Sequence, residues 1–294
     1  MLLSYSQAFY ELKNKLQPLY DEREAEALAH EILYYLTGLN KTQRLLQKET
    51  LFTEPQQEKY EQAVRELLSG KPLQYVTGYS WFMGREYIVN EHVLIPRPET
   101  EELVQWIIDD ALNSIPIAIG MEFQILDIGT GSGCIPISLK LALSHADMTS
   151  CDISDVALNV AKENAKRLYA PIQFLQLDFL DASQHNKLAT YDIIVSNPPY
   201  IPALEKERMH TNVKDHEPGI ALFVPDDDPL VFYRAIAAFG KEHLKSNGYI
   251  YCELDAGQAM ECRTLFEEAG YKEVLLSKDM SGNWRMLRAG ILNR

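Results

Sequence analysis

The stretch FQILDIGTGSG, residues 123–133, decides the fold that the sequence predicts. Its first half has the apolar character of a buried strand, and its second half carries glycines at 129, 131 and 133. The segment CIPISLKLALSH follows directly and is typical of a helix. A strand, a glycine-rich turn and a helix in this order predict the start of an open α/β sheet, in which ligands bind beyond the carboxyl ends of the strands.

The same alternation of strand and helix continues towards the C-terminus. A second strand, ADMTSCDIS (146–154), leads into a helix at 155–168, for which Asp155 is the expected cap. Further strands are expected at 172–180, 191–200 and 248–254, with a helix at 229–244 and a hairpin-like tail from Tyr271. Such alternation predicts a mostly parallel sheet with helices on both faces.

Two changes of composition precede the α/β region. Residues 1–71 are rich in Leu, Glu, Lys, Gln and Ala with apolar residues at helical spacing, which predicts a small helical bundle. Residues 72–95 carry β-branched and aromatic residues around Gly78 and Gly84, which predicts a β-hairpin linker. The remaining domain, 96–294, opens with a helix that begins at Pro98.

The overall composition limits the kinds of protein that the chain can be. A formal net charge of −14 and a pI near 5.0 disfavour a free-standing nucleic-acid binder, because an acidic surface repels phosphates. The four cysteines form no C-x-x-C pair and do not cluster with histidine, so we expect reduced thiols and no metal. We expect neither a signal peptide nor a membrane-spanning segment, and therefore a cytoplasmic, soluble protein.

Acidic and aromatic residues at the next two strand ends indicate what the glycine turn binds. Asp152 ends the second strand, where a carboxylate can accept hydrogen bonds from two ribose hydroxyls. Asp178 and Phe179 end the third, where they can contact an adenine amino group and stack on its ring. A dinucleotide loop, G-x-G-x-x-G, would need a glycine at Cys134 instead of Gly133. The set therefore favours S-adenosylmethionine, which has no pyrophosphate, over NAD.

The segment NPPY, residues 197–200, ends the fourth strand and indicates the chemistry. Asn197 and the carbonyl of Pro198 can accept the two hydrogens of an NH₂ group. Pro199 stiffens the turn, and Tyr200 is placed to stack on a planar substrate. Amide and aryl-amine nitrogens are poor nucleophiles because their lone pair is delocalised, so orientation towards a methyl donor does much of the work. The residues alone suit adenine, cytosine, guanine or a glutamine amide equally.

The whole chain resembles the release factor glutamine methyltransferase family. The resemblance is carried by PLQYVTGYSWFMGREYIVNEHVLIPRPETEELV (72–104), DIGTGSG, Asp152, Asp178 with Phe179, NPPY, HEPGIAL (216–222) and the tail KDMSGNWRMLR. One departure is FVPDDDPLVFYR (223–234), where the family usually has a glycine-containing segment. The resemblance implies a Rossmann-like, S-adenosylmethionine-dependent methyltransferase domain, preceded by a helical domain (1–71). We expect this domain to dock the protein substrate, but a purely structural bundle explains its helical pattern equally well.

That family methylates the side-chain amide of the glutamine in the Gly-Gly-Gln motif of class I peptide chain release factors. The resemblance therefore implies release factors as partners and modulation of translation termination. We expect a monomer without direct nucleic-acid or membrane contact. The implied cofactor contacts are Gly129, Thr130, Gly131, Ser132, Gly133, Asp152, Asp178, Phe179 and Asn197. The implied substrate contacts are Asn197, Pro198, Pro199 and Tyr200, of which Asn197, Pro198 and Tyr200 are catalytic.

Three other functions stay open at this point. A DNA or RNA exocyclic-amine methyltransferase shares the pocket but needs a basic flank, and the sequence has no concentrated Lys/Arg tract. A scaffold protein would keep the fold without turnover, and an NAD-dependent oxidoreductase would bind nicotinamide. Arg97 and Glu99 fit capping or ion-pair roles at least as well as roles in a site.

Overall fold

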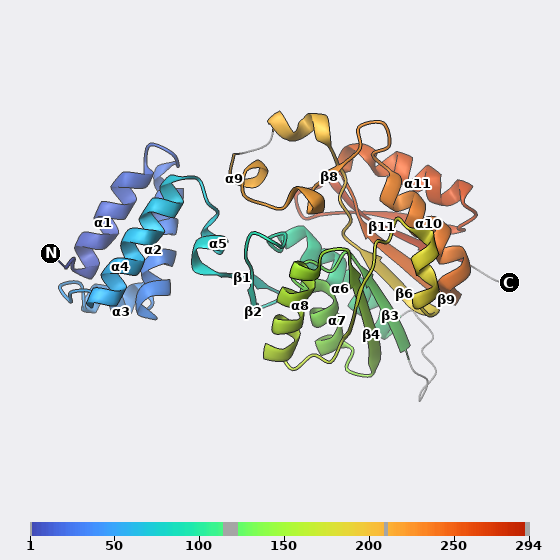
Figure 1. The fold of residues 1–294 in the computed structure, drawn as a ribbon, viewed down its shortest axis with the longest axis horizontal. Coiled ribbons are helices and arrows are strands. Elements are labelled where there is room, and N and C mark those ends of the chain that lie inside the picture. Colours follow the sequence, from blue (N-terminus) through green and yellow to red (C-terminus); the bar gives the residue numbers. More distant parts are fainter. Residues whose placement is uncertain (1, 114–122, 209–210, 292–294) are drawn as a thin grey trace. The chain divides into compact units, whose positions relative to one another are not determined.

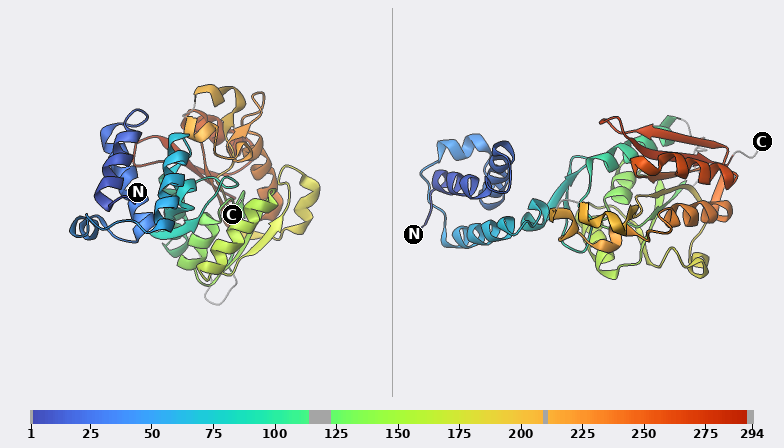
Figure 2. Two further views of the ribbon diagram at one scale, coloured as in Figure 1. Left: turned by 60° about the vertical axis from the view of Figure 1, so that its left-hand side comes forward. Right: turned by 90° about the horizontal axis from the view of Figure 1, so that it is seen from above.

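The computed structural model of the chain describes residues 2–113, 123–208 and 211–291 (Figure 1, Figure 2). The chain divides into two compact units, with the first boundary between Tyr79 and Ser80. The first unit also contains the short helix α9 (Thr211–Lys214). Within the described ranges, no helix is both long and apolar enough to cross a membrane.

The first unit is built on four helices, as the composition of 1–71 predicts. They are α1 (Tyr5–Leu16), α2 (Glu22–Thr37), α3 (Lys41–Leu46) and α4 (Glu54–Leu68). Each follows a residue whose side chain accepts a hydrogen bond from the first turn, namely Ser4, Asp21, Asn40 and Thr53. Leu12, Leu33 and Leu67 are buried in the core between the helices. Burial of their amphipathic faces supplies most of the stability of such helices.

The segment 72–95 contains the expected hairpin, but the hairpin occupies only part of it. A short helix, α5 (Leu73–Thr77), comes first and ends at Gly78, whose φ of 81° is left-handed. The strands β1 (Tyr79–Phe82) and β2 (Arg85–Ile88) then form a two-stranded sheet. Proline before and glycine after this helix set its ends, which the β-branched and aromatic content of the segment did not indicate.

The second unit is organised around a seven-stranded sheet with the order β10-β11-β9-β6-β3-β4-β5. The strands are β3 (Phe123–Ile128), β4 (Ala146–Asp152), β5 (Gln173–Gln176), β6 (Tyr191–Ser196), β9 (Leu244–Glu253), β10 (Glu273–Lys278) and β11 (Trp284–Gly290). Neighbouring strands are parallel, except that β11 is antiparallel to both β9 and β10. The strand order reverses between β3 and β6, which is where this class of sheet binds ligands.

Several element bounds expected for this sheet were wrong, and two of these errors bear on the cavity. The third strand ends at Gln176 instead of continuing to 180, so Asp178 and Phe179 lie in the loop after it. Helix α8 (Asp155–Arg167) is capped by Ser154, whose Oγ accepts from the Ala157 N–H at 3.2 Å. Asp155 is therefore already inside the helix and is not its cap.

Helices cover both faces of the sheet, as the alternation predicts. Helices α6 (Pro98–Asn113), α7 (Cys134–Ala142) and α8 pack on one face, and α10 (Val231–His243) and α11 (Ala259–Glu268) pack on the other (Figure 1). Consecutive side chains of β3 enter the two cores in turn, Ile125 on the side of α7 and Leu126 on the side of α10. Two short strands, β7 (Ile201–Pro202) and β8 (Phe223–Val224), form a separate parallel pair. Short 3₁₀ turns at Ala182–Lys187, Ala203–Arg208, Gly219–Ala221 and Ala256–Gln258 complete the connections.

One buried amide joins the hairpin to the glycine turn. Asn164 on α8 is fully buried, and its Nδ2 donates to the carbonyls of Ile88 and Ser132, both at 2.9 Å. Its Oδ1 accepts from the Ile88 N–H at 2.7 Å. Both amide hydrogens and one oxygen lone pair are thus used, and the turn after β3 is held from outside by α8.

We predict that Asn164→Leu lowers the free energy of unfolding by about 2–4 kcal/mol, because it leaves buried main-chain groups of Ile88 and Ser132 without partners. Urea denaturation followed by circular dichroism measures the change. Glu163→Ala, at an exposed position of the same helix, is the control and should change the free energy by less than about 0.5 kcal/mol. A loss below about 1 kcal/mol in Asn164→Leu would contradict the assigned role.

Candidate active site

The glycine turn after β3 is held against the next strand by main-chain hydrogen bonds. The N–H groups of Gly129 and Thr130 donate to the Cys151 carbonyl at 2.9 and 3.1 Å. Gly129 and Gly131 have φ values of 77° and 52°, and a Cβ at either position would meet no atom within 4 Å. The backbone conformation therefore calls for glycine, and the space beside both residues is open to a ligand.

Gly133 has a different role from the other two glycines. A Cβ there would lie 3.0 Å from Ile137 Cδ1 and 3.2 Å from Ala161 Cβ, so its lack of a side chain lets α7 approach α8. Gly129 and Gly131 line the neighbouring cavity, whereas Gly133 and the buried Thr130 and Ser132 lie behind them. The cofactor contacts predicted for these last three positions stay predictions.

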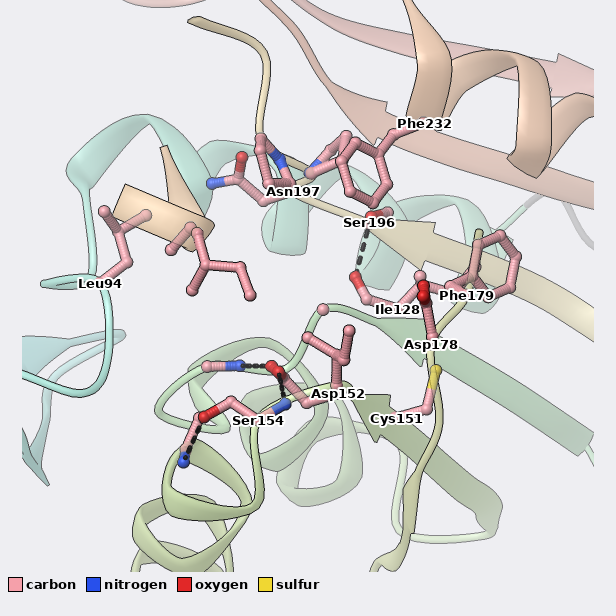
Figure 3. Close-up of a pocket in the computed structure, with 18 of the residues that line it drawn as sticks. Leu94, Ile128, Cys151, Asp152, Ser154, Asp178, Phe179, Ser196, Asn197 and Phe232 are labelled. Carbon is pink, nitrogen blue, oxygen red and sulfur yellow. Dashed lines mark hydrogen bonds between the residues drawn. The ribbon is translucent and has the colours of Figure 1, made fainter. Parts of the chain in front are cut away.

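A cavity of about 310 Å³ lies at the carboxyl ends of β3, β4 and β6, where the strand order reverses (Figure 3). Asp152 forms part of its wall, and the two carboxylate oxygens accept from the N–H groups of Gly131 and Ser154, both at 2.9 Å. Burial raises the pKa of Asp152, and these N–H donors counteract that rise. The carboxylate keeps further lone pairs for hydroxyl groups of a ligand.

Asp178 and Phe179 also line the cavity, although they follow β5 and do not end it. Asp178 Oδ1 accepts from the Leu180 N–H at 2.9 Å. The Phe179 ring is 5% exposed and packs edge-on against Phe239, with the ring centroids 5.2 Å apart. The hydrophobic core thus fixes the ring beside the cavity, and its role as an adenine contact stays a prediction.

The Asn-Pro-Pro-Tyr segment leaves β6 on the side of the cavity opposite Asp152 (Figure 3). Ser196 Oγ donates to the Ile128 carbonyl at 2.8 Å, which ties the end of β6 to the end of β3. The residues of the segment that line the cavity are Asn197, Pro198 and Pro199. These three residues therefore border the same space as Asp152.

Tyr200 lies outside the residues that line this cavity. Its partly buried ring packs against the core on the α10 side of the sheet. Gln258 Nε2 donates to the Tyr200 carbonyl at 3.2 Å, and the Tyr200 hydroxyl donates to Glu253 Oε1 at 3.4 Å. The structure therefore joins Tyr200 to a buried carboxyl group, and its stacking on a substrate stays a prediction.

Three segments whose side chains the motifs did not assign complete the cavity wall. His92 and Leu94 come from the chain after the hairpin, and Ile220 and Ala221 come from the HEPGIAL segment. Phe232 is contributed by the segment 223–234, in which the sequence departs from the family pattern. These positions carry no local signal for a site, because only the tertiary fold brings them together.

A buried ion pair connects the chain after the hairpin with the HEPGIAL segment. Glu217 Oε1 accepts from Arg97 Nη2 at 2.5 Å, and Glu217 Oε2 accepts from the Ile95 N–H at 3.3 Å. The Glu217 side chain is almost completely buried, which makes its pairing with Arg97 necessary for stability. Arg97 thus takes the ion-pair role that fitted its position in the sequence.

Two buried carboxyl groups lie in the strands that carry the site. Asp127 in β3 accepts from Ser150 Oγ at 2.7 Å, and Glu253 at the end of β9 accepts from Thr100 Oγ1 at 2.6 Å. Burial raises the pKa of each carboxyl group to about 7, against the lowering effect of these hydrogen bonds. Sequence reasoning missed Glu253, although an acidic residue that ends the apolar strand GYIYCEL is a signal for it.

The chain offers no obvious ligands for a metal in the ranges that the structure describes. No group of three or more His, Cys, Asp or Glu residues there is arranged to hold an ion. The four cysteines are buried and unpaired. Burial raises the pKa of the Cys134 thiol to about 12, so this residue is a poor nucleophile near neutral pH.

Comparisons with known proteins agree with this arrangement. The PrmC N-terminal domain family matches residues 7–78, and the methyltransferase small domain family matches residues 112–214. A release factor glutamine methyltransferase of Flavobacterium psychrophilum is 40% identical over 273 residues, which cover 93% of this chain and 94% of the relative. The protein of the same name from Bacteroides thetaiotaomicron is 38% identical, over 95% of this chain and 97% of the relative.

Among solved structures, the human METTL16 catalytic domain bound to an RNA hairpin has a TM-score of 0.55. It is 16% identical and the match covers 83% of this chain and 84% of that one, so the likeness shows the fold alone. Fold and site together define a Rossmann-like methyltransferase. The identity to full-length relatives goes further: this chain belongs to the release factor glutamine methyltransferase family. The resemblance read from the sequence is thereby confirmed.

The two buried carboxyls predict how stability depends on pH. Their pKa values of about 7 lie above the ordinary values of 3.8 and 4.5. Between about pH 4 and pH 7 the folded state therefore binds more protons than the unfolded state, so the free energy of unfolding falls as the pH rises. We predict that Asp127→Asn flattens this slope, as measured by urea denaturation at a series of pH values.

Asp147→Asn is the control for the loss of one carboxyl group, because Asp147 lies exposed on β4. A slope in Asp127→Asn as steep as that of the unmodified protein would show that Asp127 does not titrate in this range.

Proposed function

We propose that this protein transfers a methyl group from S-adenosylmethionine to the side-chain amide of the Gly-Gly-Gln glutamine in class I peptide chain release factors. The named relatives support the class of substrate. The observation that carries the chemistry is that Asn197, which lies across the cavity from Asp152 in Figure 3, and its neighbour Pro198 both line the cavity. A planar NH₂ group placed between these walls meets two carbonyl acceptors on one side and the methyl donor on the other.

The residues around the cavity fit S-adenosylmethionine. Gly129 and Gly131 leave open space where side chains would stand, so the methionine part of the cofactor can approach the backbone. Asp152 has free lone pairs for the two ribose hydroxyls. Ile128 and Leu177 add apolar surface for a ring. The volume of about 310 Å³ is within the range of small-molecule sites, about 300–1,000 Å³.

The chain's own groups act by orientation and by electrostatics. S-adenosylmethionine supplies a sulfonium methyl, whose bond to sulfur breaks as the amide nitrogen forms the new bond. Asn197 Oδ1 and the Pro198 carbonyl accept the two amide hydrogens, so the nitrogen is aimed at the methyl group and its developing positive charge is stabilised. Such positioning can contribute up to about 7–11 kcal/mol. The methylated nitrogen then loses one proton to solvent, so the reaction needs no strong base.

We assign the supporting parts of the chain in the same proposal. The helical domain (1–71) docks the release factor. The linker (72–95) lines the cavity through His92 and Leu94, and the domain 96–294 is catalytic. The enzyme acts as a monomer in the cytoplasm, where release factors are found. The family match at 7–78 supports the role of the helical domain as a distinct part.

We predict that Asp152→Ala weakens binding of S-adenosylmethionine by about 10–100-fold in isothermal titration calorimetry, because two hydrogen bonds to a carboxylate are lost. Asp155→Ala, three residues away on the exposed side of α8, is the control and should leave the affinity within about twofold. Equal affinity of Asp152→Ala and the unmodified protein would remove Asp152 from the site. Binding of NAD by the unmodified protein would instead favour an oxidoreductase.

We predict a gain of one methyl group, about 14 Da, on the Gly-Gly-Gln glutamine when an unmethylated release factor is incubated with this protein and the cofactor. Fragmentation mass spectrometry locates the group. Asn197→Ala should lower the rate of methyl transfer about 100-fold, because the amide nitrogen is no longer positioned. Transfer to DNA or RNA in parallel reactions, with none to the release factor, would replace the proposal by nucleic-acid methylation. The family assignment argues against that alternative.

A further inference from the structure

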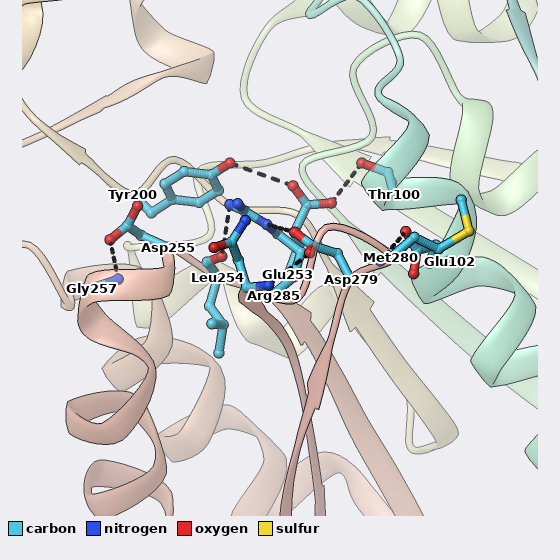
Figure 4. A network of polar contacts seen from close by, with 11 residues as sticks. Thr100, Glu102, Tyr200, Glu253, Leu254, Asp255, Gly257, Asp279, Met280 and Arg285 are labelled. Atoms are coloured by element: carbon cyan, nitrogen blue, oxygen red, sulfur yellow. Dashed lines mark hydrogen bonds and ion pairs between the residues drawn. The ribbon is translucent and has the colours of Figure 1, made fainter.

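A chain of hydrogen bonds runs from Asn197 into the protein interior, away from the cavity. Asn197 Nδ2 donates to Thr100 Oγ1 at 3.1 Å, and Thr100 Oγ1 donates to Glu253 Oε2 at 2.6 Å. The Tyr200 hydroxyl donates to the second carboxylate oxygen, Oε1, at 3.4 Å (Figure 4). One buried carboxyl group is therefore connected to both ends of the Asn-Pro-Pro-Tyr segment. Thr100 is only 3% exposed and Glu253 2%.

The single hydrogen of the Thr100 hydroxyl determines the orientation of the Asn197 amide. A threonine hydroxyl has one hydrogen. An ionised Glu253 carboxylate can only accept, so this hydrogen goes to the carboxylate across the 2.6 Å contact. Thr100 Oγ1 can then only accept, so the group of Asn197 that faces it is the NH₂ group. The amide carbonyl of Asn197 is left for the cavity, where the proposed reaction needs an acceptor.

We infer that Thr100 and Glu253 are positioning residues, which hold the Asn197 amide with its oxygen towards the substrate and its NH₂ group towards the protein interior. Neither residue touches the substrate. This inference rests on the proposed function and adds to it, because it assigns the source of the hydrogen-bond polarity that the acceptor site requires. Without Thr100 Oγ1 as an acceptor, the Asn197 amide can rotate and present a donor, which repels the substrate NH₂ group.

Several contacts hold Glu253 in this position. Its carbonyl accepts from the buried Tyr233 hydroxyl at 3.0 Å, and its Cα partner in the sheet is Met286 of β11. The neighbouring Leu254 carbonyl accepts from Arg285 Nη1 at 3.4 Å, and Arg285 Nε pairs with Asp279 at 3.3 Å (Figure 4). Strands β9 and β11 thus hold the Glu253 carboxylate beside Thr100 of α6.

Protonation of Glu253 would reverse the polarity of the chain. A neutral carboxyl group can donate to Thr100 Oγ1, which frees the threonine hydrogen to point at Asn197 and favours the rotated amide. The groups that face this carboxyl are Thr100 and Glu99 of α6, Tyr200, and Arg285 of β11. Burial raises the pKa of Glu253 to about 7, while Thr100, Arg285 and Tyr200 oppose that rise. Loss of activity on the acid side of this value is therefore expected.

The first test compares Thr100→Val with Thr100→Ser in methylation of a release factor. Thr100→Val keeps the shape but removes the hydroxyl, and we expect kcat to fall about 10–100-fold with KM for S-adenosylmethionine within about threefold. Thr100→Ser restores the hydroxyl and should return kcat to within about threefold of the unmodified protein. A purely structural role of Thr100 would lower the melting temperature without this division between kcat and KM.

Each outcome of this test decides one question. If the unmodified protein does not methylate the release factor, the proposed function fails and the positioning role fails with it. If the unmodified protein is active and a folded Thr100→Val keeps kcat within about threefold, the positioning role alone is overturned. It is also overturned if Thr100→Ser is as slow as Thr100→Val. In that case the packing of the threonine methyl group, and not its hydroxyl, would determine kcat.

A second measurement decides the matter even if Thr100→Val does not fold. In the unmodified enzyme, kcat should fall as the pH is lowered from 8 to 6, through the pKa of Glu253 of about 7. The glutamine of Glu253→Gln cannot titrate, so kcat of this variant should not fall between pH 8 and pH 6, even if kcat is lower than in the unmodified enzyme. A fall in kcat that persists unchanged in Glu253→Gln would assign the titration to another group and overturn the role of Glu253.

Discussion

The parallel pairing of β4 and β6 on either side of β3 sets the position of the groups around the cavity. Ile128, the last residue of β3, is paired with Cys151 of β4 and with Ser196 of β6. The residues that follow these three are Gly129, Asp152 and Asn197. The ladder therefore brings the glycine turn, the carboxylate and the amide to one level at the edge of the sheet. A slip of one residue in either pairing would turn a strand's side chains to the opposite face. Every side-chain contact in the site therefore depends on the register of the main-chain hydrogen bonds.

This dependence explains which parts of the site the sequence could predict. Strand, turn and helix signals lie within a few residues of each other, so the sheet and the groups at its strand ends were predicted from local patterns. The ends of short elements were less well predicted, because single residues decide them: a proline and a glycine bound α5, and one hydrogen bond to the Ser154 side chain caps α8. Thr100 and Glu217 were missed because their partners are distant in sequence: Thr100 binds Glu253, 153 residues away, and Glu217 binds Arg97, 120 residues away.

The motifs also proved to be mixtures of positions with different duties. In the glycine turn, Gly129 and Gly131 open the backbone towards the cavity, while Gly133 lets two helices pack closely. In the Asn-Pro-Pro-Tyr segment, Asn197 faces the cavity, while Tyr200 reaches a buried carboxyl group. Neighbouring residues of one motif can therefore have different roles: some contact a ligand, and others support the fold. The support includes carboxyls whose burial reduces stability near neutral pH, a cost that sites of this kind carry for function.

The antiparallel strand β11 has a consequence for how the enzyme is made. Glu253 is paired with Met286 of this strand, and Arg285 holds the neighbouring Leu254 carbonyl. The chain leaves the ribosome from its N-terminus, and domains fold as units once their residues have emerged. A nascent chain that ends before Trp284 has β9 at an open sheet edge, with nothing on that side to hold the carboxylate against Thr100. The support of Glu253 from β11 therefore forms only after that strand has left the ribosome.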